Sequence, residues 1–534
     1  MIRSSPSSLT VFILIFVAIL LLHLPLLRLP FFWDEAGYYI PAARDLLLSG
    51  SLIPHSTPSN AHPPLVMAYL AAWWKLLGFS IFVTRIAMLF VAAFSLLGVF
   101  RLGRQVANVP VALAATACTA LYPVFFTQST MAHVDLAAAG LTFWALEAYL
   151  GERWYTAAAW FSLAVLAKET AVLAPLAVLG WEIVTWLPVQ PLKALLASTN
   201  SAWLKQSSDT NPGGARSRFV SLIAPVVVLS LWYAYHYART GYVFGNPEFF
   251  RYNVQATMSG VRIALALLMR SWQAFGYMHL WVLVLLMLWA MTRDPLDQRG
   301  RIDVPVQLIF TALAVTFIVA LAVIGGAVLA RYMLTVVPLV ILVAISTLWR
   351  RMQSWLWLAG LVCLAFVMAL FFNPPYGFSF EDNLAYRDFV LMHQDAESFL
   401  EQRYPQARVL TAWPASGEIT QPYLGYIKQR LRVVRIEDFT LDEMLGAAQE
   451  RSRFDVALVF STKYEPPRPM LDRWRAWEKM KTRFFGFHRD VPPGVAAQIL
   501  GGHVVFTEKS TGQWVAVIEV EKMYEAKGTS PYAP

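Results

Sequence analysis

Cysteine is almost absent from this 534-residue chain, which contains only two. Cys118 and Cys363 each lie within an apolar run, where a cysteine behaves as a small hydrophobic residue. The sequence therefore has no CxxC pair, no zinc-type cysteine spacing and no disulfide framework. These absences exclude a disulfide-stabilised secreted domain and a cysteine-based zinc site.

Charge is also scarce. Charged residues make up 14% of the chain, whereas 57% of residues are hydrophobic and the mean hydropathy is +0.50. This balance differs from that of an ordinary soluble protein and predicts a membrane protein with many spans. The net charge of +9 does not indicate nucleic-acid binding, because basic residues beside spans are the usual topology signal and no basic stripe is interleaved with aromatics.

The N-terminal apolar run superficially resembles a signal peptide. It extends from Leu9 to Leu29 after Arg3, which is too long, and no small-residue cleavage pattern follows before Trp33. We therefore expect an uncleaved first span with the N-terminus in the cytoplasm.

The run Pro63–Gly78 decides the topology. It has 16 residues, fewer than the ~20 that a spanning helix needs. If it spanned, Arg101 and Arg104 would face outward, against the positive-inside rule, and Asp135 would lie on the side opposite Asp34. An aromatic-rich helix in the membrane interface removes both conflicts, so we predict interfacial helices in a first outer loop over residues 30–83.

The sequence then predicts eleven spans, with both the first outer loop and the C-terminal part outside the cytoplasm. The spans are Leu9–Leu29, Thr84–Leu102, Pro110–Thr127, Val134–Leu150, Tyr155–Ala167, Ala171–Leu187, Phe219–Ala238, Trp272–Met291, Val304–Ile324, Tyr332–Leu348 and Trp355–Phe372. Surface helices are predicted over Ala36–Ser49, which Gly50 is placed to end, and over Val261–Met269; residues 188–218 form a polar cytoplasmic loop.

The composition changes at Asn373, where two prolines break the last helix and the density of charge rises. Short β-prone runs are Val409–Trp413, Leu431–Ile436 and Asp455–Phe460, with a hairpin at Val504–Thr507 and Trp514–Val520 and helices at Tyr386–Tyr404 and Leu441–Gln449. The fold class predicted is an α-helical polytopic membrane protein of the plasma (inner) membrane, with a transmembrane domain over residues 1–372 and an extracytoplasmic α/β domain over 373–534.

Polar residues that are costly near a membrane converge on the outer face under this topology. They are Asp34, Glu35, His62, Asp135, Lys168, Glu169 and Arg331. A charged residue at membrane depth costs about 2.5–3.5 kcal/mol on insertion scales. Singly, each has a simpler explanation as a helix-start acid, a loop histidine, a snorkelling lysine or an interface anchor. Those explanations do not predict a common side, so we expect a site there.

The same residues occur within motifs in one order along the chain. They are Trp33-Asp34-Glu35, His62-Pro63-Pro64, Asp135, Leu166-Ala167-Lys168-Glu169-Thr170 and Ala330-Arg331-Tyr332. This set resembles the GT-C glycosyltransferases of the protein O-mannosyltransferase and lipid A aminoarabinose transferase superfamily (glycosyltransferase family 39). The resemblance is clearest over Phe31–Leu187 and fades towards Leu348.

The resemblance implies transfer of a sugar from a polyprenyl-phosphate carrier in the membrane to an acceptor outside the cytoplasm. Asp34 matches the general base of that family, and Glu35 matches the acid that supports it. His62-Pro63-Pro64 is similar to the mannosyltransferase version of a motif that has a lysine in aminoarabinose transferases. The predicted site residues are Asp34, Glu35 and Asp135 as catalytic groups, and Lys168, Arg331, His62 and Tyr332 at the donor phosphate.

The chemistry of the residues agrees with this assignment. Attack at an anomeric carbon needs a base, and a phosphate leaving group needs cations, for which Lys168 and Arg331 are candidates. Direct displacement with Asp34 as base predicts inversion; a retaining route needs a second carboxylate ~5 Å away, and Asp135 is the candidate. Asp34, Glu35, Asp135 and a histidine could also ligate a divalent metal, although no spacing specifies one.

Two other functions fit a chain of this kind. A transporter or lipid-carrier flippase would place charged groups and broken helices near the bilayer midplane. A membrane-anchored binding protein would act through Asn373–Pro534. The charged residues gather at one face instead, and eleven spans are excessive for an anchor. The partners expected are therefore the lipid-linked donor, membrane lipids and an acceptor hydroxyl on a lipid, glycan or protein, and no nucleic acid.

Overall fold

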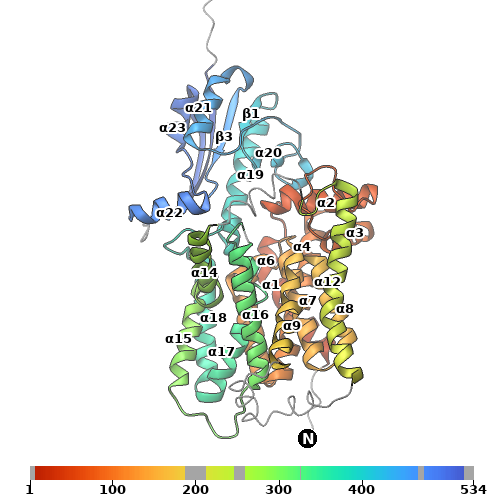
Figure 1. Cartoon of the computed structure of the whole chain (residues 1–534). Helices are drawn as coiled ribbons and strands as arrows, with labels where there is room; N and C mark the ends of the chain where they lie inside the picture. The colour runs from red at the N-terminus through yellow and green to blue at the C-terminus, as the bar shows by residue number, and fades with distance from the viewer. Residues whose placement is uncertain (1–6, 187–211, 246–258, 325, 467–473, 522–534) are drawn as a thin grey trace, which may run out of the picture. The chain divides into compact units, whose positions relative to one another are not determined.

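The structure is a computed structural model, and it describes residues 7–186, 212–245, 259–324, 326–466 and 474–521. Packing divides the chain into two compact units, which Figure 1 shows in one view. The helical unit comprises Met1–Arg28, Tyr38–Pro374 and Ser379–Tyr386, and the α/β unit comprises Leu29–Gly37, Pro375–Phe378 and Arg387–Pro534.

The helical unit consists of long apolar helices that run alongside one another (Figure 1). Its helices are α1 (Ser8–His23), α2 (Ile40–Ser49), α3 (Leu65–Leu77), α4 (Ile81–Val106), α5 (Val109–Leu121), α6 (Pro123–Gln128), α7 (Val134–Leu150), α8 (Trp154–Ala167), α9 (Leu173–Trp186), α12 (Pro212–Thr240), α14 (Gly260–Phe275), α15 (Leu280–Met291), α16 (Val304–Val323), α17 (Val337–Arg351) and α18 (Trp355–Phe371).

Several of these helices suit a bilayer. Within the described residues, five helical segments are long and apolar enough to cross a membrane: Ser8–Leu26, Ile81–Val106, Arg216–Thr240, Gly260–Met291 and Val304–Val323. Shorter apolar helices include α3, α5, α8 and α18. The predicted fold class, a helical polytopic membrane protein with a C-terminal α/β region, is confirmed, while the count of eleven spans and the orientation of the termini stay predictions.

Two features of the first outer loop follow from local sequence. Gly50 ends α2 in the left-handed conformation, with φ 70°, as predicted. Helix α3 has 13 residues, about 20 Å of helix, and packs against α2 and α4. Its length is well below the ~30 Å of a hydrocarbon core. Its interfacial position stays a prediction.

Two predicted spans are each divided by a break in the helix. The segment Pro110–Thr127 is not one helix, because Tyr122 is extended at ψ 123° and separates α5 from α6. Pro123 disfavours the helical conformation in the residue before it. Further along, the break lies at Met278 and His279, with φ 46° and 64°, so Trp272 belongs to α14 and not to the next helix.

Most of the predicted loop over residues 188–218 lies outside the described residues, and α12 already begins at Pro212. The predicted span Tyr332–Leu348 starts later than expected, because a 3-10 turn, Ala330–Met333, precedes α17.

The α/β unit contains a five-stranded sheet of order β2-β1-β3-β5-β4. Its elements are α19 (Ala385–Arg403), β1 (Arg408–Thr411), α20 (Ala415–Glu418), β2 (Arg432–Arg435), α21 (Leu441–Gln449), β3 (Val456–Phe460), α22 (Arg475–Phe485), α23 (Pro493–Leu500), β4 (Gly502–Ser510) and β5 (Gln513–Val520). Strand β1 pairs in parallel with β2 and β3, whereas β5 is antiparallel to both β3 and β4. Every predicted strand is present, and the β4–β5 hairpin turns at Gly512, where φ is 76°.

Helix α7 carries charged contacts near both of its ends. Asp135 lies in its first turn, and near its last turn Glu147 forms ion pairs with Arg101, at 2.8 Å, and with Arg153. Twelve residues of helix, about 18 Å, separate the two carboxylates. Arg101 and Arg153, predicted to be cytoplasmic, therefore lie at the end of α7 opposite to Asp135.

Close packing of α7 on α4 fixes the position of Asp135. Gly140 of α7 meets Ser95 of α4 so closely that a Cβ atom at Gly140 would overlap the Ser95 side chain. Ser95 is 1% exposed and its hydroxyl donates to the Val91 carbonyl oxygen at 2.8 Å, so it has little room to move. Overfilling a packed core in this way costs about 1–3 kcal/mol.

We expect Gly140→Ala to lower the thermal-denaturation midpoint of the purified protein in detergent. The matched control is Gly180→Ala in α9, where an added Cβ meets nothing within 4 Å. That control should be neutral or stabilising, because alanine favours helix by about 1 kcal/mol over glycine. Restoring space with Ser95→Gly should recover part of the loss. Equal midpoints for the Gly140 and Gly180 variants would contradict this packing.

Candidate active site

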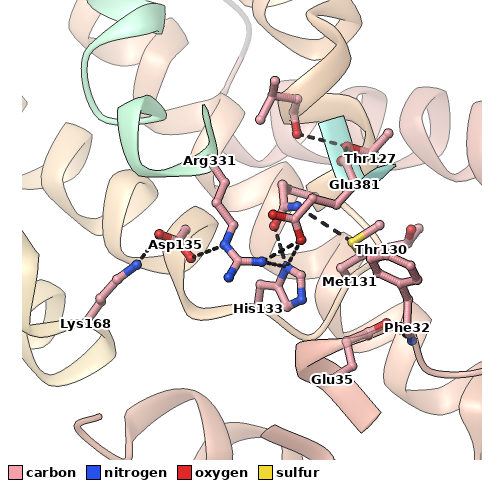
Figure 2. A network of polar contacts seen from close by, with 12 residues as sticks. Phe32, Glu35, Thr127, Thr130, Met131, His133, Asp135, Lys168, Arg331 and Glu381 are labelled. Carbon is pink, nitrogen blue, oxygen red and sulfur yellow. Dashed lines mark hydrogen bonds and ion pairs between the residues drawn. The ribbon is translucent and has the colours of Figure 1, made fainter. Parts of the chain in front are cut away.

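Four charged side chains form a buried network at the start of α7 (Figure 2). They are Asp135, Lys168, Arg331 and Glu381, and each residue is only 3–6% exposed. The Lys168 ammonium is ion-paired with Asp135 Oδ1, and Arg331 Nε lies 3.3 Å from Asp135 Oδ2. Arg331 Nη1 also donates to Glu381 Oε2 at 2.6 Å. Arg331 therefore bridges two carboxylates.

Each of these groups sits where a helix begins or ends. Asp135 is in the first turn of α7, Lys168 directly follows α8, and Arg331 lies in the turn before α17. Glu381 lies in a 3-10 turn, Phe380–Asp382, beyond α18, and the Thr127 hydroxyl donates to its backbone oxygen. The structure thus brings together three of the predicted residues, Asp135, Lys168 and Arg331, from distant parts of the chain.

Tyr332 adds an aromatic face to the same cluster. Its ring centre lies 3.8 Å from Lys168 Nζ, 5.3 Å from Arg270 Cζ and 5.8 Å from Arg331 Cζ. A cation over an aromatic face is attracted by the ring quadrupole, more strongly when water is excluded. The ring therefore helps to hold three cations close to one another.

Arg270 was not predicted from the sequence. It is fully buried in α14, and its guanidinium donates to the carbonyl oxygens of Ala327 at 2.8 Å and Leu329 at 2.7 Å. These contacts neutralise no charge. Lys168 and Arg331 form ion pairs with Asp135 and Glu381, and Arg270 adds a third buried cation to the cluster.

Lys168 stays charged in this setting. Burial alone would lower its pKa, but Asp135, together with Tyr332 and Glu169, outweighs burial and raises the pKa above its ordinary value. A buried ammonium held in its charged form suits the binding of an anion.

His62 pairs with Glu169, the residue that follows Lys168. Its Nδ1 lies 2.8 Å from Glu169 Oε2. Burial would raise the pKa of Glu169, but the charge and hydrogen bond of His62, with Lys168, outweigh burial and lower the pKa to about 2. The carboxylate of Glu169 is thus ionised over the whole physiological range.

His133 is a neutral neighbour of the network. Its Nδ1 lies 2.8 Å from Gln128 Oε1, to which a ring N–H donates, and 3.2 Å from Arg331 Nη1. Because burial and the positive charges of Arg331, Arg85 and Lys168 disfavour imidazolium, the pKa of His133 lies well below its ordinary value. The ring of Tyr39 packs near both His62 and His133. Its centroid lies 5.9 Å from that of His62 and 5.7 Å from that of His133.

Asp34 and Glu35 belong by packing to the α/β unit. The Glu35 carboxylate is fully buried and accepts a hydrogen bond from the Phe32 amide at 2.9 Å, while the Glu35 amide donates to the Phe32 carbonyl oxygen at 2.9 Å. These two bonds close a tight turn around the half-buried Asp34. Glu35 also begins a π-helical turn that ends at Tyr39.

The turn contains a strained residue. Trp33 has φ 46°, a conformation that is unusual for a bulky residue. Its ring packs edge-on against Trp413 at 4.9 Å and Phe389 at 5.6 Å. Gly37 leaves room for the Trp413 ring, since a Cβ at this position would lie 2.6 Å from Trp413 Nε1. Strained residues that their surroundings hold in place are often found at functional sites.

A buried acidic pair after the last helix was missed by sequence reasoning. Glu381 and Asp382 follow the Asn373-Pro374-Pro375 break and were assigned to the polar α/β domain with their neighbours. The signal that could have found them is the one that identified Asp34 and Glu35, namely two adjacent acids among aromatics just beyond an apolar helix. Arg270 gives no comparable signal, because a single arginine in an amphipathic helix is common.

Comparison with known proteins agrees with this architecture. Residues 61–202 match the dolichyl-phosphate-mannose-protein mannosyltransferase family. No curated protein matches the sequence significantly. The matched segment contains His62, Asp135 and Lys168. It makes up about a quarter of the chain.

Solved structures resemble the chain over nearly its whole length. ArnT from Cupriavidus metallidurans bound to undecaprenyl phosphate has a TM-score of 0.51 and 14% identity, with 95% of this chain and 97% of that chain covered. Its apo form also has a TM-score of 0.51, with 13% identity over 96% and 98% of the two chains. The oligosaccharyltransferase AglB from Archaeoglobus fulgidus, in complex with an inhibitory peptide and a dolichol-phosphate, has a TM-score of 0.50 and 12% identity, covering 95% and 74%. At these identities the likeness is one of fold, and with the family match it confirms the resemblance drawn from the motifs.

The buried carboxyl group of Asp382 should make the stability of this part of the structure depend on pH. Its carboxylate is buried and accepts from the Tyr277 hydroxyl at 2.6 Å. Burial raises its pKa from 3.8 to about 7, and the Tyr277 hydrogen bond and the charge of Arg331 offset only part of that rise. Between about pH 4 and about pH 7 the folded chain therefore holds a proton that the unfolded chain has lost, and the contribution of Asp382 to stability falls as pH rises.

We expect Asp382→Asn to weaken the loss of thermal stability between about pH 5 and about pH 8, because the amide cannot ionise. Denaturation midpoints of the wild type and the variant across this range measure the effect. Asp297→Asn, a change in an exposed loop, should keep the wild-type pH dependence. Identical pH profiles for Asp382→Asn and wild type would show that this carboxyl ionises normally.

Proposed function

We propose that this chain, assigned to the GT-C glycosyltransferases by its fold and by the family match over residues 61–202, transfers a sugar from a polyprenyl-phosphate donor to an acceptor hydroxyl outside the cytoplasm. The fold and the family match support transferase activity in a membrane. The donor, the acceptor and the roles of individual residues are parts of the proposal.

The observation that carries the proposal is the cluster of three buried cations around Tyr332. Lys168, Arg270 and Arg331 lie within 6 Å of one ring and face two carboxylates. Buried charges require partners, and a phosphate oxyanion would complete this set. Preorganised cations of this kind stabilise charge that develops on a leaving phosphate.

Known relatives supply the class of donor. The matching family is named for dolichyl-phosphate-mannose, ArnT was crystallised with undecaprenyl phosphate and AglB with a dolichol-phosphate. All three lipids are polyprenyl phosphates, which a protein with membrane-spanning helices could bind from the bilayer. The sugar itself, a hexose or a pentose, is not implied by these names.

Asp34 is the proposed general base. In our scheme its carboxylate accepts the proton of the acceptor hydroxyl as that oxygen attacks the anomeric carbon. The bond from this carbon to the phosphate oxygen breaks at the same time, and the electron pair leaves with the polyprenyl phosphate. Glu35 positions Asp34 through its hydrogen bond with the Phe32 amide. A single displacement of this kind inverts the anomeric centre.

The contacts of Asp135 favour inversion over retention. A retaining route would need a free carboxylate to attack the sugar. Asp135 instead has one oxygen ion-paired with Lys168 and the other 3.3 Å from Arg331 Nε. We assign it the role of positioning these two cations, and we assign Tyr332 and the His62–Glu169 pair to the border of the donor site. A divalent metal stays a proposal, which activity with and without a chelator would test.

The role of Asp34 is tested by Asp34→Asn in membranes supplied with a labelled polyprenyl-phosphate sugar. Loss of the base should lower the rate of transfer by about 100-fold or more, with expression unchanged. Asp294→Asn, in an exposed loop predicted to be cytoplasmic, should leave the rate unchanged. Undiminished transfer by Asp34→Asn at normal expression would overturn the assignment.

The role of Lys168 is tested by comparing Lys168→Gln with Lys168→Arg. If Lys168 stabilises the leaving phosphate, the glutamine variant should lose about 100-fold in kcat, and the arginine variant should retain part of the activity. Lys75→Gln, an exposed lysine of α3, is the matched control. A change in KM alone would instead mean that Lys168 binds the donor equally in the ground state and the transition state.

A further inference from the structure

A second cluster of titratable side chains lies within the α/β unit. His393 and Glu397 are one turn apart on α19, and Glu418 ends the short helix α20. Each is at most 1% exposed. One ligand atom from each of the three residues lies within 4.8 Å of the others. Two glutamates and a histidine thus meet inside the core of a domain.

The cluster satisfies only part of its own polar atoms when both glutamates are ionised. His393 Nδ1 lies 2.8 Å from Glu418 Oε2 and 3.8 Å from Glu397 Oε1. A side-chain hydrogen bond joins Glu397 to Glu418 when one of the two carries a proton. With both ionised, neither oxygen of Glu397 has a hydrogen-bond partner among the described residues, and the same is true of Glu418 Oε1 and His393 Nε2. Leaving a buried polar atom without a partner costs about 1–3 kcal/mol, and more if it is charged. The cluster is therefore satisfied either by a proton that the two glutamates share or by a cation that replaces it.

The surroundings offer no balancing charge. The His393 ring stacks on Phe389 at 3.9 Å and meets Phe460 edge-on at 4.6 Å. Within the part of the chain that the structure describes, neither glutamate has a lysine or arginine partner. Burial, the nearby negative charge of Glu418 and a hydrogen bond with Glu418 raise the pKa of Glu397 well above its ordinary value. The two carboxylates can be neutralised by added protons or by a cation.

We propose that His393, Glu397 and Glu418 bind a divalent first-row transition-metal ion. Imidazole nitrogen and carboxylate oxygen are both ligands of such ions, and two carboxylates cancel the charge of the metal. Ligand atoms ~2.0 Å from a tetrahedral ion stand ~3.3 Å apart. The 2.8 Å and 3.8 Å separations bracket that value, so small side-chain shifts would form the site.

This metal would have a structural role, because the site lies in the core of the α/β unit and joins α19 to α20. An ion that binds only the folded chain stabilises it in proportion to the logarithm of its concentration over Kd. Affinity should rise with pH, since the ion must displace protons from the histidine and the glutamates. The inference does not depend on the proposed transferase activity.

The test uses the full chain in detergent, stripped with a chelator and titrated separately with Zn²⁺ and Mn²⁺. We expect about one equivalent of one of these ions to bind and to raise the denaturation midpoint. Glu397→Gln and Glu418→Gln should each weaken that binding by at least tenfold and remove most of the thermal shift. His503→Gln, an exposed histidine of β4, is the matched control and should bind like the wild type.

Three outcomes would overturn the proposal. In the first, the stripped wild type binds neither ion more tightly than Glu397→Gln does, and the variant is at least as stable as the wild type. This result would identify the glutamates as a buried carboxyl pair that shares a proton. The second is binding that survives both glutamine variants but is lost in Asp135→Asn, which would place the ion elsewhere. The third is a variant that fails to fold while Co²⁺ added to the wild type gives no ligand-field spectrum.

Discussion

The buried carboxylate of Asp135, held between Lys168 and Arg331, is the interaction on which the helical unit depends. Two cations and an acid cannot be taken out of water unless each has a partner, so the helix ends that carry them must meet. Residues from the start of α7, the end of α8 and the turn before α17 are fixed relative to one another in this way. The close contact of α7 with α4 at Gly140 fixes the position of α7 along α4, and with it the position of Asp135.

Much of this arrangement follows from the sequence. The apolar runs predict the helices, and the predicted topology puts Asp135, Lys168 and Arg331 on one side, in agreement with the contacts among these three side chains. The β-prone runs of the C-terminal part are all strands. Short alternating or fully apolar runs bounded by turn residues are typical of strands and are too short for buried helices. The break at Tyr122 is readable in hindsight, since proline restricts the residue before it.

Other parts could not be read in advance. Arg270 and Glu381 acquire their roles from partners far away in the chain, the carbonyl oxygens after α16 and the guanidinium of Arg331. No periodicity or spacing encodes such a pairing. The sequence also gives no sign that the turn around Asp34 packs with the α/β unit. That packing depends on the contacts of Trp33 with Trp413 and Phe389, which are distant in the sequence. The Phe389 ring in turn stacks on His393, so the core of that unit continues up to the turn.

The membership of residues 29–37 in the α/β unit has a consequence for biosynthesis. The segment that carries Asp34 leaves the ribosome about 350 residues before the segment 387–534 that it packs against. At roughly 5–20 residues per second this interval lasts about 20–70 s. During that time the strained conformation of Trp33 has no Trp413 or Phe389 to hold it. The turn thus reaches its final form only after Phe389 and Trp413 have been synthesised, and a chain that ends before them lacks the packing that holds its proposed base.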